Sequence, residues 1–253
     1  MPERLLAPDG VPFVVAEFSH AGATLVAEDF GAGDRPIVLL HGIGMGRSVY
    51  VDLVGRLDGR IIGIDLPGFG EAPEPVRTLT MERHADLVAA FLRDRGIADA
   101  IVVGHSMGSQ IAAEVGARHP GVVSALVLAG PTVNSAKRSV AAQAGYLFVD
   151  LVGERPLVLW RGAREYLRGG PHLIRKMRAT IVHHPENAYP RIRVPTLVLR
   201  GQHDPLAPSD WCEQIVAAIP DARFAEVPGH GHGTMISDAE VAADTIRDFR
   251  ARV

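Results

Sequence analysis

The chain has 253 residues, with 26 basic and 29 acidic side chains and a formal net charge of −3. A composition of 47% hydrophobic and 22% charged residues excludes intrinsic disorder, and no glycine period suggests a fibrous protein. The single cysteine, Cys212, excludes an internal disulfide framework. No apolar run approaches the roughly 18 residues that span a bilayer, and no secretory signal is recognised, so we expect a cytoplasmic protein.

Continuous apolar runs recur along the chain and predict strands that are buried on both faces. After a predicted hairpin of residues 13–18 and 24–28, these runs occupy residues 36–40, 61–65, 100–103 and 125–129, and two further strands are predicted at residues 196–199 and 223–227. Helical periodicity lies between them, at residues 79–94, 110–115, 209–219 and 239–249. The alternation predicts an α/β fold with a mostly parallel sheet, whose ligands bind at the carboxyl ends of the strands.

The strongest chemical signal is the sequence Gly-His-Ser-Met-Gly at residues 104–108, between a predicted strand and a predicted helix. Small residues at both ends permit a tight turn that exposes the Ser106 hydroxyl above the sheet. The turn also directs the Met107 amide at the same point, beside a helix N-terminus that favours negative charge. We therefore predict that Ser106 is a nucleophile.

A serine nucleophile needs a histidine base that is held by a carboxylate. The loop after the strand at 196–199 supplies Asp204, and the loop after the last strand supplies His230 and His232. We predict the order Ser106, Asp204 and His232, with His230 as the alternative base. A metal site at His230 and His232 is disfavoured, because no further ligands accompany them at a set spacing.

These motifs resemble the α/β-hydrolase-fold serine hydrolases, in the cap-bearing branch of esterases and lipases, and the resemblance covers nearly the whole chain. The matching segments are His41–Gly44, Asp65–Gly70, residues 104–108, residues 201–208 and the pair Gly231-His232. The resemblance implies that the backbone amides of Ile43 and Met107 form an oxyanion hole and that no cofactor is used. Ser109 and the pair Glu71-Ala72 depart from the frequent family pattern, outside the triad.

Residues 132–194 separate the sixth and seventh predicted strands, where this family places a cap. This segment has 11 basic and 4 acidic residues, whereas the rest of the chain has 15 basic and 25 acidic residues. The opposite charges predict a separate layer that docks on the core. We expect a hydrolase core at residues 1–131 and 195–253 and a helical cap at residues 132–194, enclosing a mainly apolar pocket.

The sequence thus predicts a serine hydrolase of a small, mainly apolar carboxylic ester, without metal or cofactor. Three alternatives stay open: a carbon–carbon bond hydrolase of ring-fission products, a cofactor-free perhydrolase, and a small-molecule receptor that does not turn over. The first is mildly disfavoured, because such relatives often have asparagine where this chain has His105. No nucleic-acid-binding motif is present, no membrane span is expected, and the sequence does not predict the oligomeric state.

Overall fold

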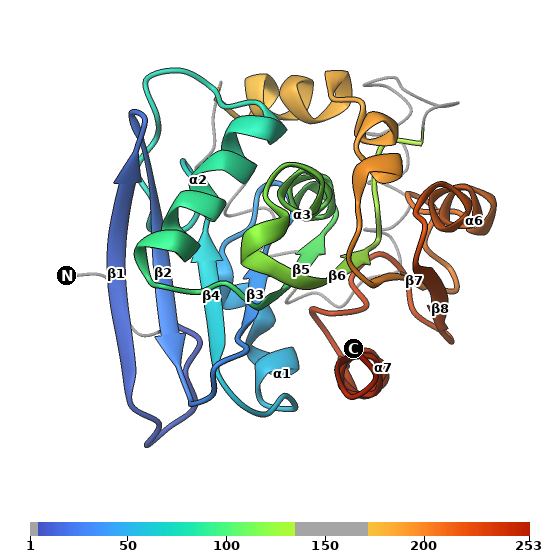
Figure 1. Cartoon of the computed structure of the whole chain (residues 1–253), viewed down its shortest axis with the longest axis horizontal. Coiled ribbons are helices and arrows are strands. Elements are labelled where there is room, and N and C mark those ends of the chain that lie inside the picture. Colours follow the sequence, from blue (N-terminus) through green and yellow to red (C-terminus); the bar gives the residue numbers. More distant parts are fainter. Residues whose placement is uncertain (1–4, 135–171) are drawn as a thin grey trace.

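The computed structural model describes residues 5–134 and 172–253 (Figure 1). In these ranges eight strands form one sheet, in the order β1-β2-β4-β3-β5-β6-β7-β8. They are β1 (Phe13–His20), β2 (Ala23–Phe30), β3 (Ile37–Leu40), β4 (Ile61–Asp65), β5 (Ala100–His105), β6 (Val123–Ala129), β7 (Thr196–Gly201) and β8 (Ala222–Val227). The pairs β1–β2 and β2–β4 are antiparallel and all other neighbours are parallel, which confirms the predicted mostly parallel sheet.

Helices cover both faces of the sheet in Figure 1, with α2, α3 and α6 on one face and α1 and α7 on the other. Their bounds are α1 (Val51–Val54), α2 (Met81–Asp94), α3 (Met107–Arg118), α6 (Ser209–Ala218) and α7 (Glu240–Arg250). The sequence predicts all of these except α1. Its four residues are too few for a hydrophobic period to be recognised.

The core lies on both sides of the sheet, because side chains alternate along each strand. In β3, Val38 and Leu40 join the cluster beneath α2 and α3, whereas Ile37 and Leu39 join the cluster beneath α1 and α7. All four side chains are at most 1% exposed. Burying each such side chain contributes about 1.5–3 kcal/mol, which explains why the parallel strands are unbroken apolar runs.

The inserted segment begins after β6 and ends before β7, and residues 135–171 of it lie outside the described residues. The predicted division into a core and a helical cap therefore stays a prediction. Of the described part, residues 172–182 are helical, and short 3-10 turns follow at Pro185–Asn187 and Tyr189–Arg191. No helix in the described ranges is long and apolar enough to cross a bilayer.

Candidate active site

Ser106 lies at a sharp turn between β5 and α3, with backbone angles φ 56° and ψ −117°. Such a conformation costs a non-glycine residue about 1–3 kcal/mol, and the surrounding packing enforces it. A Cβ atom at Gly104 would lie less than 3.0 Å from the Gly108 carbonyl oxygen, and one at Gly108 would lie equally close to the Leu40 carbonyl oxygen. The two glycines of the motif are thus required because backbone segments meet there.

Asp204 and His232 form a buried pair at the ends of β7 and β8. The Nδ1 atom of His232 donates to Oδ2 of Asp204 at 2.8 Å. The other carboxylate oxygen, Oδ1, accepts from the amides of Leu206 at 2.9 Å and Ala207 at 3.1 Å. Burial alone would raise the pKa of Asp204, but the charge of His232 and these hydrogen bonds outweigh it and lower the pKa. The carboxylate is therefore ionised and fixed in orientation.

The end of β6 connects the serine turn to this pair. The amide of Ser106 donates to the carbonyl of Ala129 at 2.9 Å. The next residue, Gly130, has φ 50°, and a Cβ atom there would lie 2.9 Å from Cε1 of His232 and 3.2 Å from Oδ2 of Asp204. The end of β6 thus passes directly beside the pair, and Ser106, Asp204 and His232 all follow strand ends at the same edge of the sheet.

His105 is a second link between the serine turn and the loop of His232. Its ring is fully buried and lies 4.8 Å, between ring centroids, from the ring of His232. Its Nε2 atom donates to the backbone carbonyl of His232 at 2.8 Å. Burial, together with the charge of His232, lowers the pKa of His105 to about 3, so this ring is neutral. The residue before Ser106 therefore holds the loop of His232 in place.

The amides predicted to hold an oxyanion belong to Ile43 and Met107. Among the described residues, neither amide donates a hydrogen bond to a backbone carbonyl. The loop of Ile43 is fixed by the buried ring of His41, which donates from Nδ1 to the Gly42 carbonyl at 2.7 Å and accepts at Nε2 from the Leu66 amide at 3.0 Å. Burial lowers the pKa of His41, which favours the neutral ring. Only a neutral imidazole has one nitrogen that donates and one that accepts.

A buried ionic network supports the same loop from the other side. Arg47 is fully buried and pairs with three carboxylates: Glu28 at 3.0 Å, Glu71 at 2.6 Å, and Asp65 at the end of β4. Glu28 also accepts the backbone amides of residues 5–7 at 2.8–3.0 Å, so the network joins four segments of the chain. Nothing in the sequence signals this pairing, because Glu28, Arg47 and the segment with Asp65 and Glu71 lie in separate parts of the chain and no motif links them.

His230, the alternative base, points elsewhere. Its Nδ1 faces the carbonyl of Pro228 at 2.8 Å and its Nε2 faces the carbonyl of Asp238 at 3.2 Å. His230 is half-buried, whereas His232 is 5% exposed and bonded to Asp204. The geometry therefore favours His232 over His230.

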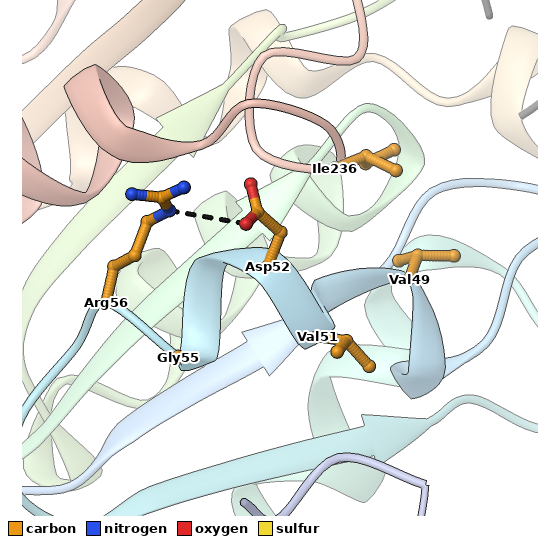
Figure 2. A pocket seen from close by; sticks show the side chains of 6 residues that line it. All are labelled: Val49, Val51, Asp52, Gly55, Arg56 and Ile236. Carbon is orange, nitrogen blue, oxygen red and sulfur yellow. Dashed lines mark hydrogen bonds and ion pairs between the residues drawn. The ribbon is translucent and has the colours of Figure 1, made fainter.

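An open hollow of about 430 Å³ lies at α1 (Figure 2). Its lining residues are Val49, Val51, Asp52, Gly55, Arg56 and Ile236. Figure 2 shows Asp52 and Arg56 facing each other, with 3.3 Å between Oδ1 and Nε. Asp52 also accepts the amide of Ala239 at 2.7 Å, beside the start of α7. None of the five predicted site residues lines this hollow, so we assign its polar groups to fold stability.

Within residues 5–134 and 172–253, the side chains that converge closely enough to share one metal ion are Glu82, Glu114 and His183. None of them is a predicted site residue. Cys212 is buried, and burial raises the pKa of its thiol to about 12, as expected for a packing residue.

Comparison with known proteins agrees with this fold. Residues 37–245 match the model of the alpha/beta hydrolase family. The AB hydrolase superfamily protein YisY of Bacillus subtilis is 27% identical, over 89% of this chain and 95% of the relative. A 2-hydroxy-6-oxononadienedioate/2-hydroxy-6-oxononatrienedioate hydrolase of Paraburkholderia phymatum is 26% identical, over 87% of this chain and 88% of the relative.

Among solved structures, a thermophilic esterase from Thermogutta terrifontis superposes with a TM-score of 0.70 and 24% identity, over 95% of this chain and 98% of that one. At this identity the likeness shows the fold alone. The family model, by contrast, spans most of the sequence, from β3 into α7. The chain belongs to the alpha/beta hydrolase family.

Proposed function

We propose that this hydrolase cleaves a small, mainly apolar carboxylic ester through an acyl-enzyme intermediate. Ser106 Oγ attacks the ester carbonyl carbon while His232 takes the hydroxyl proton, and Asp204 orients the imidazole and stabilises its positive charge. The amides of Ile43 and Met107 donate to the oxyanion that forms. Collapse of this intermediate breaks the bond to the alcohol oxygen, which takes the proton from His232. Water then attacks the acyl group by the same route and releases the acid.

The observation that carries this proposal is the Asp204–His232 pair beside the strained turn of Ser106. A hydrogen-bonded carboxylate and imidazole at 2.8 Å is the arrangement by which a base is held in one tautomer. The turn costs stability that a purely structural loop would not need. Both features occur at the carboxyl ends of parallel strands in one sheet, where sheets of this type bind ligands, and β6 lies between β5 and β7.

The proposed substrate class rests on the sequence of the inserted segment and on the similar proteins. The apolar residues of the segment at 132–194 favour a pocket for an apolar acyl or aromatic group, and esterases occur among the proteins of similar fold. The same catalytic groups serve the carbon–carbon hydrolase and the perhydrolase alternatives, and one relative is named as a hydrolase of a 2-hydroxy-6-oxo dienedioate. The identity of the substrate, rather than that of the catalytic groups, therefore distinguishes an esterase from a carbon–carbon hydrolase or a perhydrolase.

The experiment is the steady-state release of p-nitrophenol from short-chain p-nitrophenyl esters. Ser106→Ala and His232→Asn are each expected to lower turnover by on the order of a million-fold. His230→Asn is the matched control, and it should retain wild-type turnover because both of its ring nitrogens face backbone carbonyls outside the pair. Retention of activity in Ser106→Ala refutes the nucleophile, and loss in His230→Asn but not in His232→Asn refutes the assigned base.

A wild-type protein that releases no more than one equivalent of p-nitrophenol refutes the ester substrate. Turnover of a 2-hydroxy-6-oxo-dienoate, followed by loss of its absorbance, would then support the carbon–carbon hydrolase. Binding of a ligand without product formation would support the receptor.

A further inference from the structure

A second group of side chains with ligand chemistry lies where α2, α3 and the chain returning from the inserted segment meet. The Nε2 atom of His183 is 3.1 Å from Oε1 of Glu114 on α3 and 3.8 Å from Oε1 of Glu82 on α2. The ligand atoms of the three residues all lie within 4.8 Å of one another. His183 and Glu114 are 6% and 3% exposed, whereas the side chain of Glu82 is 41% exposed.

The histidine ring is oriented by a neighbour on α3. The Nδ1 atom of His183 faces Oε1 of Gln110 at 2.8 Å, and the amide oxygen can only accept, so the proton is on Nδ1. Nε2 is therefore the atom that faces the two carboxylates. Bonding of the second ring nitrogen to a protein oxygen is the usual support of a metal-binding histidine. Gln110 and Glu114 are one helical turn apart, which explains why both reach the same ring.

One oxygen of the buried glutamate has no hydrogen bond in the described part of the chain. Oε2 of Glu114 is buried and accepts no hydrogen bond from the described residues. The cation facing it is Arg191, whose nearest nitrogen is 3.9 Å away, beyond hydrogen-bond range. Arg118, on the same helix, donates instead to Asp86 at 2.9 Å. An imidazole nitrogen and two carboxylates that converge in a mostly buried place are a donor set that suits a divalent cation.

We propose that Glu82, Glu114 and His183 bind one divalent metal ion, of the zinc class. Bonds of about 2.0–2.1 Å in a tetrahedral site place ligand atoms roughly 3.3 Å apart. The separations of 3.1 Å and 3.8 Å from His183 are close to this value. The half-exposed Glu82 side chain closes the remaining gap by rotation. One nitrogen and carboxylate oxygens suit zinc better than calcium or magnesium, and water completes the coordination.

The ion would join α2 and α3 to the end of the inserted segment. Gln110 extends this connection to the start of the segment, because its Nε2 faces the carbonyl of Thr132 at 3.4 Å. The inferred role is structural, since none of the three ligands belongs to the predicted catalytic groups. The proposal departs from our sequence-based expectation of no metal. Residues 82, 114 and 183 have no recognisable ligand spacing, and only the fold brings them together.

The test is zinc binding by protein stripped with a chelator and dialysed, measured by isothermal titration calorimetry. Cobalt substitution adds the visible absorption of a tetrahedral site. Wild type is expected to bind one equivalent and to show a higher Tm with zinc. Glu82→Gln and His183→Asn should each weaken binding at least tenfold. His184→Asn, which alters the neighbouring exposed histidine paired with Glu186, should bind as wild type does.

Glu82→Gln keeps the proposal testable if His183→Asn fails to fold, because the Glu82 side chain is 41% exposed and glutamine has nearly the same size. Two results would overturn the proposal. The first is the absence of saturable zinc binding to wild type, which would mean that the three side chains make only contacts within the protein. The second is unchanged affinity in both ligand variants, which would place the metal at other histidines. Neither result depends on the esterase activity.

Discussion

Replacing Ser106 by glycine is expected to stabilise the fold while it abolishes hydrolysis. With φ 56° and ψ −117°, the residue lies outside even the small left-handed helical region that other residues visit. The strain is therefore near the upper end of the about 1–3 kcal/mol that such conformations cost. Glycine relieves it, but loses about 0.7 kcal/mol to chain entropy and about 0.8 kcal/mol to the missing buried carbon. The net gain is about 1 kcal/mol.

Ser106→Ala is the matched comparison, because it also lacks the hydroxyl but keeps the Cβ atom that causes the strain. Both variants should be inactive toward p-nitrophenyl acetate, so activity does not distinguish them. Their free energies of unfolding do: urea denaturation should place the glycine variant about 1 kcal/mol above the alanine variant, with equal m-values. In a chain of this size, the corresponding difference in Tm is about 2–4 °C.

A glycine variant that is no more stable than the alanine variant would refute the reasoning. It would mean that the turn is relaxed in solution or that the lost packing of the Cβ atom exceeds the strain. A higher stability of both variants by the same amount would instead assign the cost to the buried hydroxyl. Only a difference between the two variants measures backbone strain.

Three further predictions follow from the packing and the buried charges. Gly108→Ala should lose at least about 2 kcal/mol in urea unfolding, because its Cβ atom would overlap the backbone of β3, whereas Gly121→Ala, with open space around it, should stay within about 0.5 kcal/mol of wild type. Lys176→Met should lose about 1.5–3 kcal/mol, because the buried ammonium donates to Glu74 and to a carbonyl in the loop after β4, each at 2.6 Å. Burial lowers the pKa of His84 to about 4, so the stability that its neutral ring contributes above pH 6.5 is lost as the pH falls toward 4, by about 3 kcal/mol. In His84→Phe, the unfolding free energy should fall less steeply over this pH range than in wild type.

The sequence predicted the strands well for a physical reason. A parallel strand between two helical layers must be apolar on both faces, so β3 and β4 are recognisable as continuous runs. The predicted helix ends are less accurate than the predicted strands, because the end of a helix depends on one capping residue. The predicted helix at residues 79–94 begins at Met81, because Thr80 accepts the amide of Arg83 and precedes the first turn.

The proposed catalytic residues could be named from sequence because each lies in a short motif at a strand end. The groups that position them could not. His105 donates to the carbonyl of His232, 127 residues later. Arg47 pairs with Glu28 of β2 and with Asp65 of β4. Such polar contacts depend on which strand ends are neighbours in the sheet. No local pattern in one sequence contains that information.

In the described part of the inserted segment, two side chains contact acidic residues of the rest of the chain. Lys176 pairs with Glu74 at 2.6 Å, and His183 lies 3.1 Å from Glu114. The ammonium of Lys176 also lies 4.3 Å from the ring centroid of Phe69, which itself packs 5.3 Å from the ring of His41, centroid to centroid.

Both attachments therefore reach the elements that carry the proposed chemistry. Glu114 is on α3, the helix that begins directly after Ser106, and His41 fixes the loop of Ile43. A displacement of residues 172–183 would therefore shift both the turn of Ser106 and the loop of Ile43, which are proposed to hold the nucleophile and an oxyanion donor. Weakening either attachment should consequently lower kcat as well as stability, whereas a segment that only selects substrate would change KM alone.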